Sequence, residues 1–293
     1  MKAIFKKELR SLLCSMRGWG YAAIVLLGAA VSVILTNVMG ATSRFELNVF
    51  YIALAMIPAT AVTASDAFQA ERRQNTERIL YSLPLKNSDI VIGKMLAHIV
   101  PVLIAAVGLC VLPLIMMPFG TVYLLPAFAA VLALTALGIA MMAIGLMVSA
   151  CARNRLLALI GIIAVLAASW LIPYLTDMLK ASGQLTIPMM LSFMLVAFTG
   201  TYLLSNSAYL GIFAAAAVEI PSLLAYLQGN GAAYMQNLAS GIDALNIYDG
   251  LNSFVNGLMS GQALIGWLLI AVLFTFITVL YIGNRRQAKR RAL

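Results

Sequence analysis

Residues 122–151 read VYLLPAFAAVLALTALGIAMMAIGLMVSAC and contain no charged side chain. An α-helix rises 1.5 Å per residue, so about 20 apolar residues are enough to cross the hydrocarbon core of a bilayer. The run is too long and too uniformly apolar for a strand of a transmembrane barrel, whereas a helix satisfies its backbone hydrogen bonds internally. We therefore predict that this segment is a membrane-spanning helix.

The rest of the chain has the same character. Of its 293 residues, 63% are hydrophobic, against roughly 45–50% in soluble domains, and the mean hydropathy is +0.98. The sequence predicts an all-α, polytopic membrane protein that forms a single transmembrane domain over residues 1–293. Eight apolar runs are candidate spans: Trp19–Val38, Leu47–Ser65, Met95–Met117, Val122–Cys151, Leu156–Thr176, Ile187–Leu203, Ala208–Leu227 and Gln262–Gly283.

The sixth and seventh runs admit two interpretations. No charge occurs between Lys180 and Glu219, and only Ser-Asn-Ser at 205–207 interrupts the apolar sequence. A tight hairpin there would add two spans to the other six and give about eight. A re-entrant pair on the outer side would leave six. The prediction favours the hairpin.

The basic residues orient the molecule. Of the 19 lysines and arginines, five precede the first span, five lie between the second and third, two between the fourth and fifth, and five follow the last. Only Arg44 and Lys180 lie on the other side. By the positive-inside rule, both termini and residues 66–94 are cytoplasmic in a multi-pass protein of the cytoplasmic membrane. Anionic membrane lipids account for the net charge of +9 without any nucleic-acid partner.

Two flanking segments are predicted to lie along the membrane surface. In residues 1–17, apolar side chains recur at spacings of three and four, and basic side chains fill the opposite face. This helix is either a basic anchor in the interface or an elbow helix that also touches a cytoplasmic partner. Residues 228–261 carry Asp243 and Asp249 but no basic residue, and are predicted to form an extracytoplasmic segment with short helices.

Residues 66–94 form a long polar insertion between two spans. No proline or glycine occurs from Asp66 to Leu80, so the second span can continue into the cytoplasm as a helix until Leu83-Pro84 breaks it. Asn87 or Ser88 is then a suitable N-cap for the helix that enters the third span. The apolar tip between the two helices either dips into the headgroup layer or fits a groove on another protein.

This arrangement resembles a known family. The polar helix, the SLP turn at 82–84, the short capped helix and Gly93-Lys94 are similar to the ATP-binding-cassette permeases of the second exporter type, particularly their gliding-motility branch. KKELRSLLCSMRGWG at 6–20 resembles the N-terminal elbow of that family. Residues 143–160, AIGLMVSACARNRLLALI, resemble the end of the fourth span and the start of the fifth. Residues 246–282 resemble the outer helix and last span, with FVNG at 254–257.

The resemblance implies the permease subunit of an exporter whose ATPase is a separate chain, paired with a second permease copy or a sister permease. Residues 66–94 would be the coupling segment that inserts into the ATPase. The implied contact residues are Glu71, Arg72, Arg73, Glu77, Arg78, Leu80, Leu83 and Pro84. ATP would be bound by the partner, since Gly93-Lys94 lacks the first glycine and the Ser or Thr of a P-loop, and no cofactor is expected here.

Few polar residues occur inside the runs. Glu219 is the only carboxyl within one, and it either contacts substrate on the pathway or is solvated near the outer surface. His98 is interpreted as a hydrogen-bonded packing residue, and Gly138, Gly145 and Ser149 as sites of close helix packing. An ion- or proton-coupled secondary transporter and a non-transporting assembly protein are the alternatives, whereas an intramembrane enzyme lacks any suitable residue constellation.

Overall fold

The computed structural model describes residues 2–74, 86–119, 121–181, 194–195 and 208–291. Every regular element in these ranges is helical, which confirms the all-α class. The chain divides into two compact units, the first containing residues 1–168 and 247–293 and the second residues 169–246. The single transmembrane domain over residues 1–293 stays a prediction.

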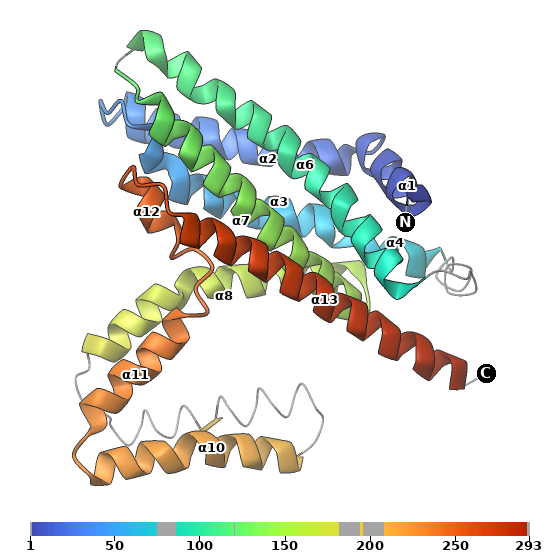
Figure 1. Cartoon of the computed structure of the whole chain (residues 1–293), viewed down its shortest axis with the longest axis vertical. Helices are drawn as coiled ribbons and strands as arrows, with labels where there is room; N and C mark the ends of the chain where they lie inside the picture. The colour runs from blue at the N-terminus through green and yellow to red at the C-terminus, as the bar shows by residue number, and fades with distance from the viewer. Residues whose placement is uncertain (1, 75–85, 120, 182–193, 196–207, 292–293) are drawn as a thin grey trace. The chain divides into compact units, whose positions relative to one another are not determined.

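The first unit contains most of the long helices (Figure 1). They are α1 (Lys2–Leu13), α2 (Met16–Val33) with its π-helical extension η1 (Ile34–Val38), the short 3-10 helix η2 (Phe45–Asn48), α3 (Val49–Ala64), α4 (Asp66–Arg73), α6 (Asn87–Met116), η3 (Met117–Phe119), α7 (Leu124–Cys151), the start of α8 (Arg155–Ala181), α12 (Leu251–Val255) and α13 (Gly261–Arg291).

Six helices in the described parts of the chain are long and apolar enough to cross a membrane. They cover Gly18–Val38, Phe45–Arg73, Asn87–Met116, Leu124–Cys151, Arg155–Met178 and Gly261–Arg286. The first five predicted runs and the last are thereby confirmed as long apolar helices. The total of eight stays a prediction. The sixth run lies outside the described residues except 194–195, and α10, which forms the seventh, is not among the six.

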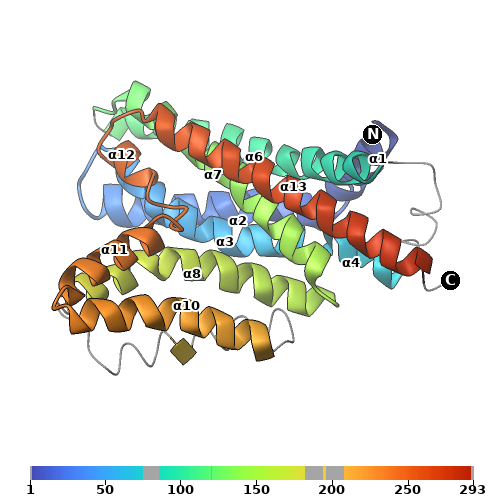
Figure 2. The same ribbon diagram turned by 60° about the horizontal axis from the view of Figure 1, so that its bottom comes forward.

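Helix α7 is the most buried of these spans and packs against α3, α6 and α13. Figures 1 and 2 show it running beside α13. Small residues make the close approach possible. A Cβ added to Gly145 would lie 2.8 Å from the Ala64 Cβ, and one added to Gly138 would lie 2.7 Å from the Met56 Cε. Ser149 donates a hydrogen bond to the Ser65 carbonyl at 3.0 Å. The packing role predicted for these three residues is confirmed.

The second unit contains the rest of α8 together with α10 (Ala208–Leu227) and α11 (Gly231–Asp243). Asp243 joins the end of α11 to the end of α8. Its Oδ2 lies 2.7 Å from the Lys180 Nζ, and its Oδ1 accepts a hydrogen bond from Thr176 at 2.7 Å. The hydrogen bonds from Lys180 and Thr176 lower the pKa of Asp243. The short helices α11 and α12 lie in the predicted outer segment.

Candidate functional site

Lys94 of α6 is the centre of a buried group of charges in the first unit. Its side chain is fully buried, at 0% exposure. The Nζ donates to the Glu8 Oε1 of α1 at 2.8 Å and to the Ala67 carbonyl at 2.7 Å. It also lies 3.2 Å from the Glu71 Oε1 of α4 and 5.2 Å from the centre of the Phe68 ring. One ammonium therefore holds three helices together.

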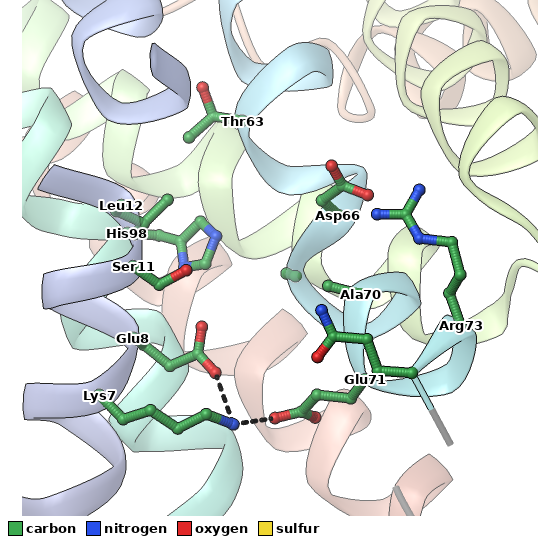
Figure 3. A pocket seen from close by; sticks show the side chains of 12 residues that line it. Lys7, Glu8, Ser11, Leu12, Thr63, Asp66, Ala70, Glu71, Arg73 and His98 are labelled. Carbon is green, nitrogen blue, oxygen red and sulfur yellow. Dashed lines mark hydrogen bonds and ion pairs between the residues drawn. The ribbon is translucent and has the colours of Figure 1, made fainter. Parts of the chain in front are cut away.

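Lys7 completes this group, and we call Lys7, Glu8, Glu71 and Lys94 the ion cluster. The Lys7 Nζ lies 3.1 Å from the Glu71 Oε1 and 3.9 Å from the Glu8 Oε1 (Figure 3). Two positive and two negative side chains give no net charge. A buried ion is costly unless it is paired and hydrogen-bonded, so the buried Lys94, Glu8 and Glu71 depend on one another, whereas Lys7 is largely exposed.

The charges also affect the acidity of Glu8. Burial alone would raise the pKa of this carboxyl, but the Lys94 ammonium and its hydrogen bond lower it, and the Lys7 charge adds to the effect. The net result is a Glu8 pKa below its ordinary value of 4.5. Glu8 is therefore ionised at neutral pH, as pairing with Lys94 requires.

A pocket of about 140 Å³ opens beside the ion cluster, between α1, α4 and the start of α6. Glu8, Thr63, Asp66 and His98 are among the side chains that line it (Figure 3). His98 is buried, and its Nδ1 donates to the Lys94 carbonyl at 2.8 Å, because a carbonyl oxygen can only accept. The histidine thus helps to fix the backbone that carries Lys94, which agrees with its interpretation as a hydrogen-bonded packing residue.

The other face of α4 binds the C-terminal end of α7. Gln69 donates through Nε2 to the carbonyls of Ser149 at 2.8 Å and Ala152 at 2.9 Å. The Arg72 guanidinium donates to the carbonyls of Ala150 and Ala152. The last carbonyls of a helix lack partners within it and carry partial negative charge, so a cation at this position caps α7.

A salt bridge at the first residue of α4 adds a further connection. The Asp66 Oδ2 lies 3.2 Å from the Nε of Arg155, the first residue of α8, and the Asp66 side chain is buried. Helix α4 is therefore joined by polar side chains to α1, α6, α7 and α8. Within the described residues, no group of three or more His, Cys, Asp or Glu side chains could hold a metal ion.

The start of α6 differs from the prediction in one detail. The N-cap is Lys86 rather than Asn87 or Ser88, and no side chain caps the helix. The Asn87 amide makes a different contact, because its Oδ1 accepts a hydrogen bond from the Arg286 Nη1 of α13 at 3.1 Å. The side chain that was expected to cap α6 instead connects it to α13.

The predicted ATPase contacts fall into three groups. Glu71 and Arg72 make the contacts within the chain described above, whereas Arg73 is exposed at the end of α4. The remaining five lie outside the described residues: Glu77, Arg78, Leu80, Leu83 and Pro84. Contact with an ATPase stays a prediction for all eight residues.

Glu219 belongs to α10 in the second unit and is not part of the ion cluster. It is half-buried, and its Oε2 has no hydrogen-bond partner among the residues that the structure describes. A Coulombic interaction with Glu219 contributes to a raised pKa of Tyr234, after the larger effect of burial. A role for Glu219 on a transport pathway stays a prediction.

In the predictions from sequence, Lys94 is a basic residue of the predicted cytoplasmic side and part of Gly93-Lys94, but a buried ion pair is not predicted and Glu8 is not considered. Two local signals could have found them. Glu8 is the only acidic residue in the first 45 residues, and Lys94 lies among apolar residues in IVIGKMLA. A charge inside an apolar run needs a partner, although the sequence does not say where that partner lies.

Comparison with known proteins agrees with this architecture. The family described as ABC-2 family transporter protein matches residues 9–155, which extend from α1 through α7 to the first residue of α8. No curated protein and no solved structure matches the chain. The family match covers just over half of the 293 residues and includes the polar insertion at 66–94 and the first four candidate spans. The chain is therefore a member of the ABC-2 family of transporter proteins, a multi-pass membrane permease.

Proposed function

We propose that this chain is the membrane subunit of an ATP-driven exporter, and that residues 66–94 couple it to a separate ATPase subunit. The observation that carries the proposal is the set of contacts made by α4. Helix α4 continues the second span, and its side chains bind α1, α6, α7 and α8. A force applied to this segment would therefore reach several spans at once.

The side chains of α4 fall into two groups, those that contact neighbouring helices and those that are exposed. Glu71 and Arg72 are held by contacts within the chain, so they would also transmit movement from the ATPase to the neighbouring helices. Arg73 and Gln74 are exposed and continue toward residues 75–85, so the surface that contacts the ATPase begins there. Glu77, Arg78, Leu80, Leu83 and Pro84 would form the remainder of that surface.

The proposed cycle needs two copies of each subunit. ATP binding draws two ATPase subunits together, and each pulls on the 66–94 segment of one permease. Movement of one rigid element against its neighbours is a common route for such coupling. Because the ion cluster joins α4 to both α1 and α6, the amphipathic N-terminal helix would move with the coupling segment and act as its elbow. The second permease would be another copy or a sister chain.

We also propose that the transport direction is export and that the chain belongs to the gliding-motility branch. Both proposals are based on the resemblance of the segments quoted above. Glu219 remains the candidate pathway residue in the second unit. The membrane is proposed to be the cytoplasmic one, with both termini inside, since 17 of the 19 basic residues lie in four segments on that side.

Co-purification tests the partnership. The tagged chain is extracted from its native host in mild detergent, and bound proteins are identified by mass spectrometry. A variant with Arg73→Glu and Arg78→Glu reverses two charges on the proposed contact surface. Arg290→Glu with Arg291→Glu is the matched control, because it makes the same charge change elsewhere on the same predicted side.

We expect a P-loop ATPase with the native chain and the control, and its loss from the contact variant. If the intact, monodisperse native chain captures no ATPase in several detergents, the proposed function is wrong. If the contact variant captures it as well as the control does, the assignment of Arg73 and Arg78 is wrong while the partnership stands.

A further inference from the structure

A second pocket lies at the ends of α7 and α13 in the first unit. It is an open pocket with a volume of about 520 Å³. The side chains that line it are Cys151, Ala152, Arg153, Tyr281, Asn284 and Arg285. Cys151 is the last residue of α7, and the apolar span in α13 ends at Arg286. The pocket is therefore located where both spans leave the membrane.

The two arginines in this pocket differ from their basic neighbours. Arg155 pairs with Asp66, Arg72 caps α7, and Lys94 is held in the ion cluster. Arg153 and Arg285 form no salt bridge with any carboxylate among the described residues. Arg285 is half-buried. Two guanidinium groups with no acid beside them, in one pocket, are suited to bind an anion.

The lining chemistry indicates which anion. Arginine presents several N–H donors in a planar fork that matches a phosphate group. The Asn284 amide and the Tyr281 hydroxyl are further donors on the same wall. Tyr281 lies within the apolar span of α13, and tyrosine is typical of the depth at which lipid headgroups lie. This depth favours a phosphate carried by a lipid over an acidic segment of a protein in the cytoplasm.

We propose that this pocket binds the phosphate of an anionic phospholipid from the leaflet that contains the basic ends of the spans. Basic pockets between transmembrane helices on the cytoplasmic side recognise such headgroups in other membrane proteins. A bound lipid would bridge α7 and α13, whose ends both contribute to the pocket. The inference concerns a lipid ligand and does not depend on the identity of the ATPase.

Native mass spectrometry of the full chain with added phosphatidylglycerol measures the interaction directly. The test variant carries Arg153→Gln and Arg285→Gln. The matched control carries Arg10→Gln and Lys86→Gln, which removes two exposed positive charges of the same predicted side outside the pocket. We expect phosphatidylglycerol affinity to fall about tenfold or more in the test variant, because each basic residue near the surface contributes appreciably to anionic lipid binding. The control variant should lose clearly less phosphatidylglycerol affinity than the test variant.

Asn284→Asp is the second variant. It keeps both arginines and places a carboxylate in the pocket, so it should also weaken lipid binding. Thermal melting and size exclusion identify any variant that fails to fold. If the variant with Arg153→Gln and Arg285→Gln misfolds and Asn284→Asp does not, the phosphatidylglycerol affinity of Asn284→Asp is the test. An unchanged affinity of that variant overturns the proposal.

Three other results would also overturn the lipid assignment. One is an equal loss of affinity in the test and control variants, which would indicate general surface attraction. Another is displacement of the lipid by millimolar inorganic phosphate, which would indicate a site for the free ion. The third is full lipid binding by the test variant together with loss of ATPase capture, which would indicate a protein contact.

Discussion

At the scale of single residues, Lys94 shows how a charge can be stable at the end of a membrane span. Its ammonium has two carboxylates, a backbone carbonyl and an aromatic ring around it, and no exposed surface. The four charges of the ion cluster come from three helices and cancel. The free energy of the cluster therefore depends most on Lys94, since its removal leaves the buried Glu8 and Glu71 carboxylates with only the exposed Lys7 as a partner from the cluster.

Lys94→Met should lower the stability of the folded chain by about 3–5 kcal/mol, because it leaves two buried carboxylates without their ammonium. Lys86→Met is the control, since Lys86 is exposed and makes no ion pair among the described residues. Thermal melting in detergent compares the two. A triple variant with Lys94→Met, Glu8→Gln and Glu71→Gln should recover much of the loss, because no buried carboxylate of the cluster remains. A triple variant that is less stable than Lys94→Met would contradict the explanation.

The acidity of Glu8 gives a prediction for pH dependence. Its folded-state pKa is below 4.5, so its contribution to stability is fully present above that pH and is lost as the pH falls through the lower folded value. The difference in melting temperature between the native chain and Glu8→Gln should be constant from neutral pH down to about 5. It should then shrink below pH 4.5. A difference that already shrinks between pH 7 and 5 would mean that Glu8 is not held ionised by Lys94.

At the scale of helices, the sequence predicted what depends on local composition. Six apolar runs became six long helices, and Gly138 and Gly145 lie where helices approach closely. The ion cluster could not be predicted in this way, because residues 8, 71 and 94 meet only through packing of α1, α4 and α6. The resemblance implied ATPase contacts for Glu71 and Arg72, and it could not show their contacts within the chain. In the fold, α1 and α7 cover two of its faces.

Two glycines of α2 offer a matched test of close packing. A Cβ added to Gly28 would lie 2.3 Å from the Ala55 Cβ of α3, whereas one added to Gly20 would meet nothing within 4 Å. Gly28→Ala should destabilise the chain by about 1–3 kcal/mol, the usual effect of overpacking. Gly20→Ala should be neutral or stabilising by up to about 1 kcal/mol, because alanine favours the helix. Equal melting temperatures for the two variants would show that α2 and α3 are not in close contact.

At the scale of the whole molecule, most of the basic residues gather at one set of span ends in the predicted topology. Residues 66–94 and both termini carry most of the positive charge, and the ion cluster and the α7 cap lie beside them. The membrane topology and the coupling proposal therefore depend on each other. If the basic ends of the spans were outside the cell, no cytoplasmic ATPase could reach α4.

Chemical labelling tests this orientation. Tyr123 is 70% exposed and lies just before α7, on the predicted outer side. A membrane-impermeant maleimide added to intact cells should label Tyr123→Cys in a background without native cysteines. A variant that keeps only Cys14, which is exposed next to α1, should be labelled only after the membrane is permeabilised. Labelling of Cys14 in intact cells would invert the topology.

Distance measurements test the transmission of movement. Spin labels at Tyr123→Cys in two permease copies should change their separation when the captured ATPase is trapped with ATP and vanadate. The triple variant that neutralises the ion cluster should still capture the ATPase but show a smaller change. Lys86→Met is again the control and should behave as the native chain does. An undiminished change in the triple variant would mean that coupling does not pass through the cluster.

The separation of Glu8 and Lys94 along the chain has a consequence for biosynthesis. The two residues are 86 positions apart, so Glu8 and the first two spans are synthesised before Lys94. Until α6 is inserted, Glu8 and Glu71 have only Lys7 as a partner from the cluster and must stay hydrated. Closure of the cluster therefore marks the arrival of the third span, and a chain arrested before that point presents two carboxylates that quality-control factors can detect.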